Sequence, residues 1–161
     1  MELRRAVTAD AEAIRRIYNV EVLTSTVTFD LVERSLEDQI DWLAARDGAH
    51  AVLVCVEQGE VVGFASLSPY RDRPAYRTTV EDSVYVHRDH QGRGVGRFLL
   101  EGLLETARDH GFHSMIGRIV GGHHASISLH QSCGFTVVGT EREVGRKFNK
   151  WLDVVLVQKL L

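Results

Sequence analysis

A glycine-rich turn is the clearest candidate for chemistry in this sequence. Gly92, Gly94 and Gly96 stand between a β-branched, aromatic run and a stretch of apolar residues at helical spacing. Glycines permit left-handed backbone and let a ligand approach closely. A helix that begins here presents unpaired N–H groups and the positive end of its dipole. The turn therefore predicts a phosphate or pyrophosphate site, to which Arg93 and Arg97 add positive charge.

Other interpretations of this turn have to be weighed. It is not a P-loop, because no Gly-Lys-Ser/Thr sequence closes it. Arg97 stands where the dinucleotide-binding fingerprint needs glycine. A tight connection between a strand and a helix, with incidental glycines, would explain the same residues. The rest of the chain has to decide between these interpretations.

The apolar pattern on both sides of the turn predicts alternating strands and helices. One strand ends at Val86, and a helix runs from Val95 to about His110, where Gly111 ends it. Thr8 and Ser35 are expected to cap two earlier helices. The remaining expected elements are strands at 3–7, 51–56, 61–67, 114–120, 136–144 and 152–160, a helix at 125–133, and loops at 69–77 and 145–151. This pattern predicts one α+β or mixed α/β domain over residues 1–161.

The composition favours a cytoplasmic enzyme. The chain has 161 residues, 44% hydrophobic and 25% charged, with a net charge of −3. This charge makes nucleic acid an unexpected partner. We expect no signal peptide, because no apolar segment follows Met1–Arg5, and no membrane span, because no run approaches ~20 apolar residues. Cys55 and Cys133 have neither disulfide-framework nor metal-type spacing.

Several segments, taken together and in order, resemble the hallmark segments of one enzyme family. The predicted order β-α-α-β-β-β-α-β-α-β-β resembles the GNAT fold, a mixed central β-sheet flanked by helices. The chain resembles the phosphinothricin and methionine sulfoximine/sulfone acetyltransferases of that superfamily over almost its whole length. This resemblance implies acetyl transfer from acetyl-CoA to the α-amine of a small amino acid analogue. The segments are 22–29 (VLTSTVTF), 79–86 (TVEDSVYV), 91–96 (QGRGVG), 125–135 (ASISLHQSCGF) and 143–153 (EVGRKFNKWLD).

The resemblance implies two catalytic side chains. Glu81 matches the catalytic carboxylate of the family and would take a proton from the ammonium group before the amine attacks. His130 matches the second catalytic position, as a base or as an acid for the CoA thiolate. A surface ion pair for Glu81 and a structural histidine for His130 are the alternatives.

The resemblance also implies how acetyl-CoA is bound. Backbone groups of 84–86 would pair with the pantetheine arm, and the turn would take the pyrophosphate. His123 stands where the family usually has an asparagine that contacts CoA, so this contact is a departure from the pattern. The full expected set is Val84, Tyr85, Val86, His87, Arg93, Gly94, Val95, Gly96, Arg97, Phe98 and His123.

An amino acid substrate needs a cation for its carboxylate. Arg71 and Arg77 match arginines of the family's corresponding loop, and a guanidinium group grips a carboxylate in bidentate fashion. A solvated basic loop is the alternative. Tyr70, Lys147 and Phe29 are also expected near the substrate, the last on its apolar side.

Three further expectations concern metals, assembly and alternative functions. The tandem histidines 123 and 124 have no carboxylate at ligand spacing, so no metal is expected. The resemblance implies a homodimer, for which the apolar segment 154–157 offers an interface, although a buried strand explains it equally well. The alternative functions are acetylation of another small amine or of a protein N-terminus, and a non-catalytic acyl-CoA sensor.

Overall fold

One seven-stranded sheet organises the molecule. The computed structural model describes residues 1–46 and 48–161. The strand order is β1-β2-β3-β4-β5-β7-β6, and every neighbouring pair is antiparallel except β4 and β5, which are parallel. The expected mixed sheet is therefore confirmed. The strands are β1 (Glu2–Arg5), β2 (Val52–Glu57), β3 (Glu60–Pro69), β4 (Thr79–Val86), β5 (Ser114–Val120), β6 (Thr136–Lys147) and β7 (Lys150–Leu160).

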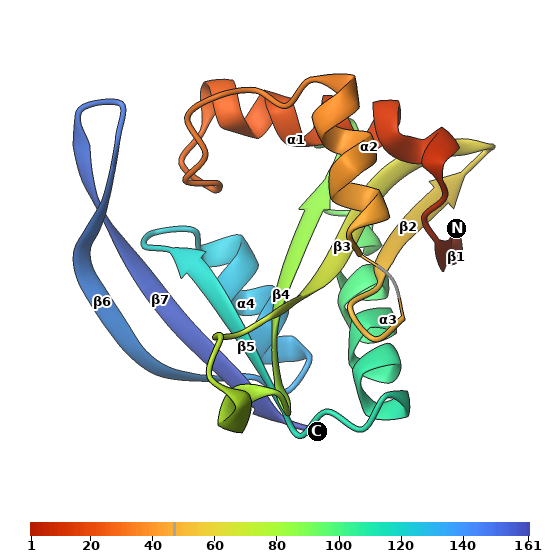
Figure 1. The fold of residues 1–161 in the computed structure, drawn as a ribbon. Helices are drawn as coiled ribbons and strands as arrows, with labels where there is room; N and C mark the ends of the chain where they lie inside the picture. Colours follow the sequence, from red (N-terminus) through yellow and green to blue (C-terminus); the bar gives the residue numbers. More distant parts are fainter. Residues whose placement is uncertain (47) are drawn as a thin grey trace.

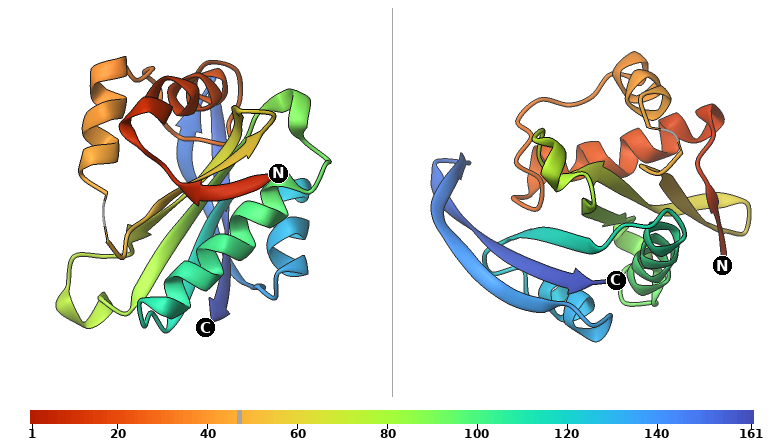
Figure 2. Two further views of the ribbon diagram at one scale, coloured as in Figure 1. Left: turned by 90° about the vertical axis from the view of Figure 1, so that its right-hand side faces the viewer. Right: turned by 60° about the horizontal axis from the view of Figure 1, so that its bottom comes forward.

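Four α-helices cover the sheet on its two faces. Helices α1 and α2 lie over one face, and α3 and α4 lie over the other (Figures 1 and 2). The order of strands and α-helices is the one expected from the sequence. The helices are α1 (Ala11–Thr24), α2 (Leu36–Ala44), α3 (Val95–Asp109) and α4 (His124–Ser132), and short 3₁₀ turns occupy Thr8–Asp10, Pro74–Tyr76 and Arg88–His90.

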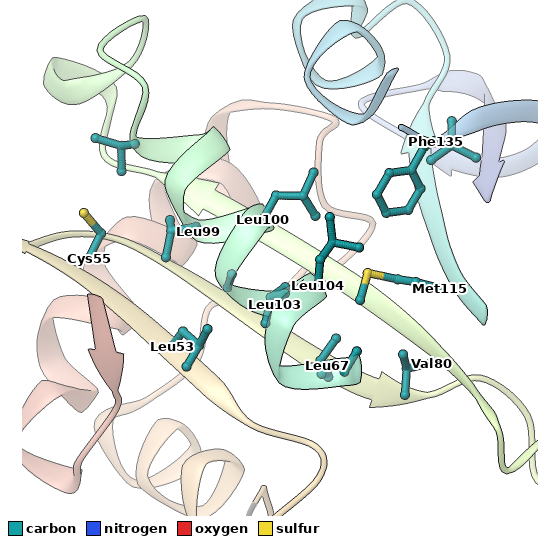
Figure 3. Packing of buried hydrophobic residues seen from close by; sticks show 14 of the residues in the cluster. Leu53, Cys55, Leu67, Val80, Leu99, Leu100, Leu103, Leu104, Met115 and Phe135 are labelled. Carbon is teal, nitrogen blue, oxygen red and sulfur yellow. The ribbon is translucent and has the colours of Figure 1, made fainter. Parts of the chain in front are cut away.

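Two hydrophobic clusters hold these layers together. Strand side chains alternate between the faces, so β2 sends Leu53 and Cys55 to the α3 side and Val52 and Val54 to the α1 side. On the α3 side, the leucines of the helix point toward the sheet (Figure 3). Each buried leucine removes enough apolar surface from water to contribute about 2 kcal/mol.

The last two strands are longer than the sequence predicted. Residues 145–151 were expected to be a loop, but β6 continues to Lys147 and β7 starts at Lys150. Phe148 and Asn149 have φ of 50° and 59°, the left-handed pair that closes a two-residue hairpin. Asparagine tolerates this conformation, which accounts for Asn149 at the turn. Val154 and Val157 are buried within the chain, in accord with the buried-strand interpretation.

The start of the chain also differs from expectation at one point. The capping box of Ser35 and Asp38 is confirmed at α2. Thr8, by contrast, does not cap α1, because it lies in a 3₁₀ turn that precedes the helix. Asp10 fixes this turn instead, because its carboxylate accepts the Val7 N–H at 2.8 Å and two bonds from Arg4 at 2.7 and 2.9 Å.

Candidate functional site

The sheet opens between its two parallel strands. β4 and β5 pair only from Thr79–Ser114 to Asp82–Gly117 and then diverge (Figure 1). Beyond Asp82, the described structure gives β4 strand partners on the β3 side alone. The backbone of 83–86 therefore faces the opening with hydrogen-bonding groups that no strand takes up.

A cavity of about 670 Å³ passes through this opening. Residues 82–86 of β4 and 118–120 of β5 line it, together with parts of the glycine-rich turn and of α4. Side chains that alternate along a strand point to opposite faces, so a lining that includes consecutive residues reaches both faces of the sheet. The cavity joins the α3–α4 side of the sheet to the α1 side.

The glycine-rich turn forms one end of the cavity. Gly94 has φ of 85°, in the left-handed region, and α3 starts at the next residue. The first helical bond runs from the Phe98 N–H to the Gly94 carbonyl at 3.0 Å, so the preceding N–H groups have no partner in the helix. A Cβ at Gly96 would lie 3.2 Å from Leu129 Cδ2, so glycine lets α3 and α4 approach closely. This geometry suits an anion.

The structure brings together only part of the expected cofactor set. Val84, Tyr85, Val86, Gly94, Gly96, Arg97 and His123 line the cavity, and His87, Arg93, Val95 and Phe98 do not. The Arg93 guanidinium lies 3.8 Å from Glu57, and the Val95 side chain is buried in the core. The Arg97 guanidinium is bound to Glu101 at 2.8 Å. Burial lowers the pKa of His123, which favours the neutral imidazole.

Glu81 lies on the α1 side of β4, outside the lining of the cavity. It is half-buried, and burial raises the pKa of its carboxyl group, while the positive charge of Arg118 opposes this shift. Arg118 lines the cavity and forms an ion pair with Glu141 at 2.7 Å. A carboxylate with a raised pKa is better matched to accept a proton near neutral pH.

Asp82 and His130 form a buried pair on the opposite side. His130 Nε2 lies 2.9 Å from Asp82 Oδ1, and His130 Nδ1 lies 2.8 Å from the Ser126 carbonyl oxygen. Burial alone would lower the pKa of His130, but the bond to Asp82 and its negative charge outweigh burial and raise it. Asp82 was not among the residues expected at the site. The sequence does contain a signal for Asp82. Every second residue of this strand, Val80, Val84 and Val86, is otherwise apolar, and Asp82 places a carboxylate in the same series.

A second group that was not expected from the sequence lies at the end of α1. Arg88, two residues after the end of β4, donates to Glu21 Oε1 at 2.9 Å and to Thr24 Oγ1 at 2.6 Å. Both Arg88 and Glu21 line the cavity. Burial would raise the pKa of Glu21, but bonds from Arg88 and Ser25 hold it below its usual value. These contacts join α1 to the mouth of the cavity.

The loop expected to bind the substrate carboxylate lies outside the cavity lining. The rings of Tyr70 and Tyr76 contact each other edge to face, with their centroids 5.5 Å apart. The Arg71 guanidinium carbon lies 5.0 Å from the centroid of the Tyr70 ring. Arg77 follows the 3₁₀ turn of this loop and is exposed. The structure therefore does not bring Tyr70, Arg71 or Arg77 together with the residues of the opening.

Lys147 and Phe29 both link β6 to the segment that follows α1. Lys147 is 4% exposed, and its ammonium group donates to the backbone carbonyls of Thr28 at 2.9 Å and Glu21 at 3.4 Å. Burial lowers its pKa. The Phe29 ring lies against Gly145, where a Cβ would come within 2.4 Å of it. Both side chains therefore hold the segment after α1 against β6.

Two features of other protein classes are absent from the described part of the chain. No three His, Cys, Asp or Glu side chains within residues 1–46 and 48–161 are grouped so that they could hold a metal ion. None of the helices in that part of the chain is both long and apolar enough to cross a membrane.

Two solved acetyltransferase structures share this fold. Ribosomal-protein-alanine N-acetyltransferase from Brucella melitensis is similar with a TM-score of 0.98 and 40% identity, covering 100% of both chains. A phosphinothricin acetyltransferase from Sinorhizobium meliloti, solved with acetyl-CoA, has a TM-score of 0.96 and 35% identity, covering 99% of this chain and 88% of that one. The fold and its opened sheet therefore define the class of protein, an acetyltransferase.

Sequence comparisons give the family. The model of the acetyltransferase (GNAT) family matches residues 13–135. L-amino acid N-acyltransferase MnaT of Escherichia coli is 44% identical over 98% of this chain and 92% of its own length. An L-methionine sulfoximine/L-methionine sulfone acetyltransferase of Salmonella typhimurium is 42% identical over 98% of this chain and 93% of its own length. This chain belongs to the GNAT family of acetyltransferases.

Proposed function

We propose that this enzyme transfers the acetyl group of acetyl-CoA to the α-amine of a small amino acid analogue such as phosphinothricin, methionine sulfoximine or methionine sulfone. The observation that carries the proposal is the cavity through the sheet, which joins a helix start suited to an anion to the side where Glu81 lies. The relatives named for amino acid, methionine sulfoximine and phosphinothricin acylation support this substrate class.

The residues of the opening fit acetyl-CoA. The free N–H groups before Phe98 suit the pyrophosphate, because glycine leaves them accessible and the helix dipole favours negative charge. On the side away from β3, the backbone of 84–86 has no strand partner and suits the amide groups of an extended arm. A neutral His123 can donate one further hydrogen bond. Bound there, acetyl-CoA supplies an activated acyl group.

Glu81 is the proposed general base. An α-amine with a pKa of about 8 is mostly ammonium at neutral pH and must lose a proton before it can attack. A half-buried carboxylate can accept this proton directly or through one water molecule. The positive charge of Arg118 opposes the rise in the pKa of Glu81 and so favours its ionised form, which is the form that accepts a proton.

The substrate-binding roles of the remaining side chains stay predictions. Arg71 and Arg77 are proposed to grip the carboxylate of the amino acid, with Tyr70 beside them. Phe29 is proposed to cover the apolar side of the bound substrate. The buried ammonium of Lys147, already bonded to two carbonyls, supports a role in holding the segment after α1 near the substrate.

A protein N-terminus is the second candidate acceptor. The Brucella melitensis structure, whose name refers to a ribosomal protein, favours this alternative. A peptide N-terminus places no free carboxylate next to its amine, so the two acceptor classes make different demands on the arginine loop. A non-catalytic acyl-CoA sensor is the third possibility and predicts binding without turnover.

Release of free thiol from acetyl-CoA tests the proposal. The acceptor panel holds phosphinothricin, methionine sulfoximine, methionine sulfone, ordinary amino acids, polyamines and a peptide with a free N-terminus. We expect turnover with the first three. Turnover with the peptide or polyamines alone would contradict the amino acid assignment. Acetyl-CoA binding without thiol release from any acceptor would support the sensor.

A single domain over residues 1–161, a cytoplasmic location and a homodimer are also proposed. The homodimer is tested by sedimentation of the full chain. We expect the mass of two copies, and a monomer at all concentrations would contradict the proposal.

A further inference from the structure

A hydrogen-bonded pair occupies the point where β4 and β5 part. The side chains of His130 and Asp82 are 4% and 2% exposed, and they come from positions 48 residues apart in the chain. Asp82 belongs to the final pair of the β4–β5 register, in which its partner is Gly117. The pair therefore lies at the closed end of the opening.

The hydrogen bonds limit where the protons of this pair can lie. The Ser126 carbonyl can only accept, so the bond at His130 Nδ1 requires a proton on that nitrogen. Asp82 Oδ1 also accepts when it is ionised, so the 2.9 Å bond at Nε2 requires a second proton. An imidazole with both nitrogens committed in this way has no free lone pair with which to act as a base.

Packing fixes the ring across the strands. The Cδ2 and Nε2 atoms of His130 would both lie 3.2 Å from a Cβ at Gly117, so the ring rests directly on the β5 backbone. The Phe135 ring contacts it edge to face, with centroids 5.0 Å apart. The pair thus ties α4 to β4 over β5, and Ser126 and Leu129 of the same helix line the cavity.

Few charged groups face this ring. Asp82 approaches from β4, and its hydrogen bond and negative charge both raise the pKa of His130. His123, just before α4, has its own pKa lowered in part by the charge of His130. β5 and β7 present Gly117 and Val157 at this point, and Glu81 lies on the opposite face of β4. Asp82 is therefore the group that determines the protonation of the ring.

We propose that Asp82 is a positioning residue of the acetyl-transfer site. It holds His130 doubly protonated across the end of the β4–β5 pairing, so that α4 keeps a fixed distance from β4 and the opening keeps its width. His130 then takes no proton from the amine, and its role is to brace the acetyl-CoA site. The kinetic consequence rests on the proposed function, whereas the protonation state does not.

Nitrogen NMR of the full-length enzyme tests the protonation state. We expect both ring nitrogens of His130 to carry protons at a pH above the ordinary imidazole pKa of about 6.5. H110N is the matched control, because His110 Nδ1 also bonds a carbonyl four residues earlier, that of Thr106 at 2.8 Å. This variant should leave the His130 signals unchanged. A singly protonated His130 in the parent would overturn the proposal.

The D82N variant tests the positioning role. An asparagine side chain has the same shape as aspartate and can donate to a neutral His130, but it replaces a charge-assisted hydrogen bond with a weaker one. We expect a singly protonated ring and a KM for acetyl-CoA raised roughly three- to tenfold, with a smaller change in kcat. A fall in kcat of about 100-fold at unchanged KM would instead assign proton transfer to the pair and overturn the proposal.

Two measurements separate this proposal from the proposed function. If the parent released no thiol with any acceptor, the Kd of acetyl-CoA would replace KM in the comparison with D82N. Equal Kd values for the parent and D82N would then overturn the positioning role. If D82N failed to fold, the spectrum of the parent alone would decide the protonation state.

Discussion

Glu81 and Asp82 are adjacent carboxylates on one strand, and their surroundings differ because β4 sends them to opposite faces. Glu81 lies half-buried on the α1 side, with Arg118 as the opposing charge. Asp82 lies on the α4 side, where it is buried and its Oδ1 lies 2.9 Å from His130 Nε2. A carboxylate with no direct partner can accept a proton, whereas one held in a buried ion pair fixes structure. The proposed general base, Glu81, and the proposed positioning residue, Asp82, are therefore neighbours in the sequence that lie on opposite faces of the sheet.

The largest expected effect comes from E81Q. Glutamine keeps the shape of the side chain but cannot take a proton, so kcat should fall by roughly 100-fold or more. E60Q, at an exposed glutamate of β3, is the matched control. Steady-state kinetics with the preferred acceptor measure both variants. If kcat of E81Q equalled that of the parent, a group other than Glu81 would be the general base. If that rate were also independent of the acceptor, the result would support the non-catalytic acyl-CoA sensor.

The G117A variant tests the Asp82 side through packing. The added Cβ would lie 2.7 Å from Val157 Cγ2 and 3.2 Å from the His130 ring, which should lower the free energy of unfolding by about 1–3 kcal/mol. G139A is the control in the same sheet, because a Cβ there meets no atom within 4 Å. Urea unfolding measures both. Equal losses in the two variants would show that the ring is not tightly held.

Arg118 gives a pH test of the Glu81 side. Burial already raises the pKa of Glu81, and Arg118 opposes this, so R118Q should raise the pKa further. The acidic limb of kcat/KM should then move to higher pH. The R118Q/E141Q double variant controls for the carboxylate of Glu141 that loses its partner. If the acidic limb of the kcat/KM profile did not move in R118Q, the titration of Glu81 would not be its cause.

The smallest expected effect is a pH dependence of stability from the Asp82–His130 pair. The pKa of His130 is raised in the folded protein, so the stabilisation is fully present below the unfolded value of about 6.5. It should be lost as the pH rises through the folded-state pKa. Urea unfolding at several pH values should show this decline in the parent and a flatter profile in D82N. Identical profiles would argue against the ion pair.

Local patterns gave much of the fold correctly. The strand–turn–helix unit around Gly94, the capping box at Ser35 and the order of the elements follow from periodicity and turn chemistry, which act over a few residues. The same rules missed the hairpin at Phe148, because positive φ in a non-glycine residue depends on the pairing of the flanking strands.

For the site, the sequence indicated the glycine-rich turn and Glu81, whose catalytic role stays a prediction. It also determined that Glu81 and Asp82 lie on opposite faces of a strand, because side chains alternate along any strand. Only the tertiary structure decided that Asp82 meets His130, that Lys147 bonds the carbonyls after α1, and that the arginine loop lies outside the cavity lining. These contacts join residues far apart in the chain, and packing between elements, which no local pattern encodes, brings them together.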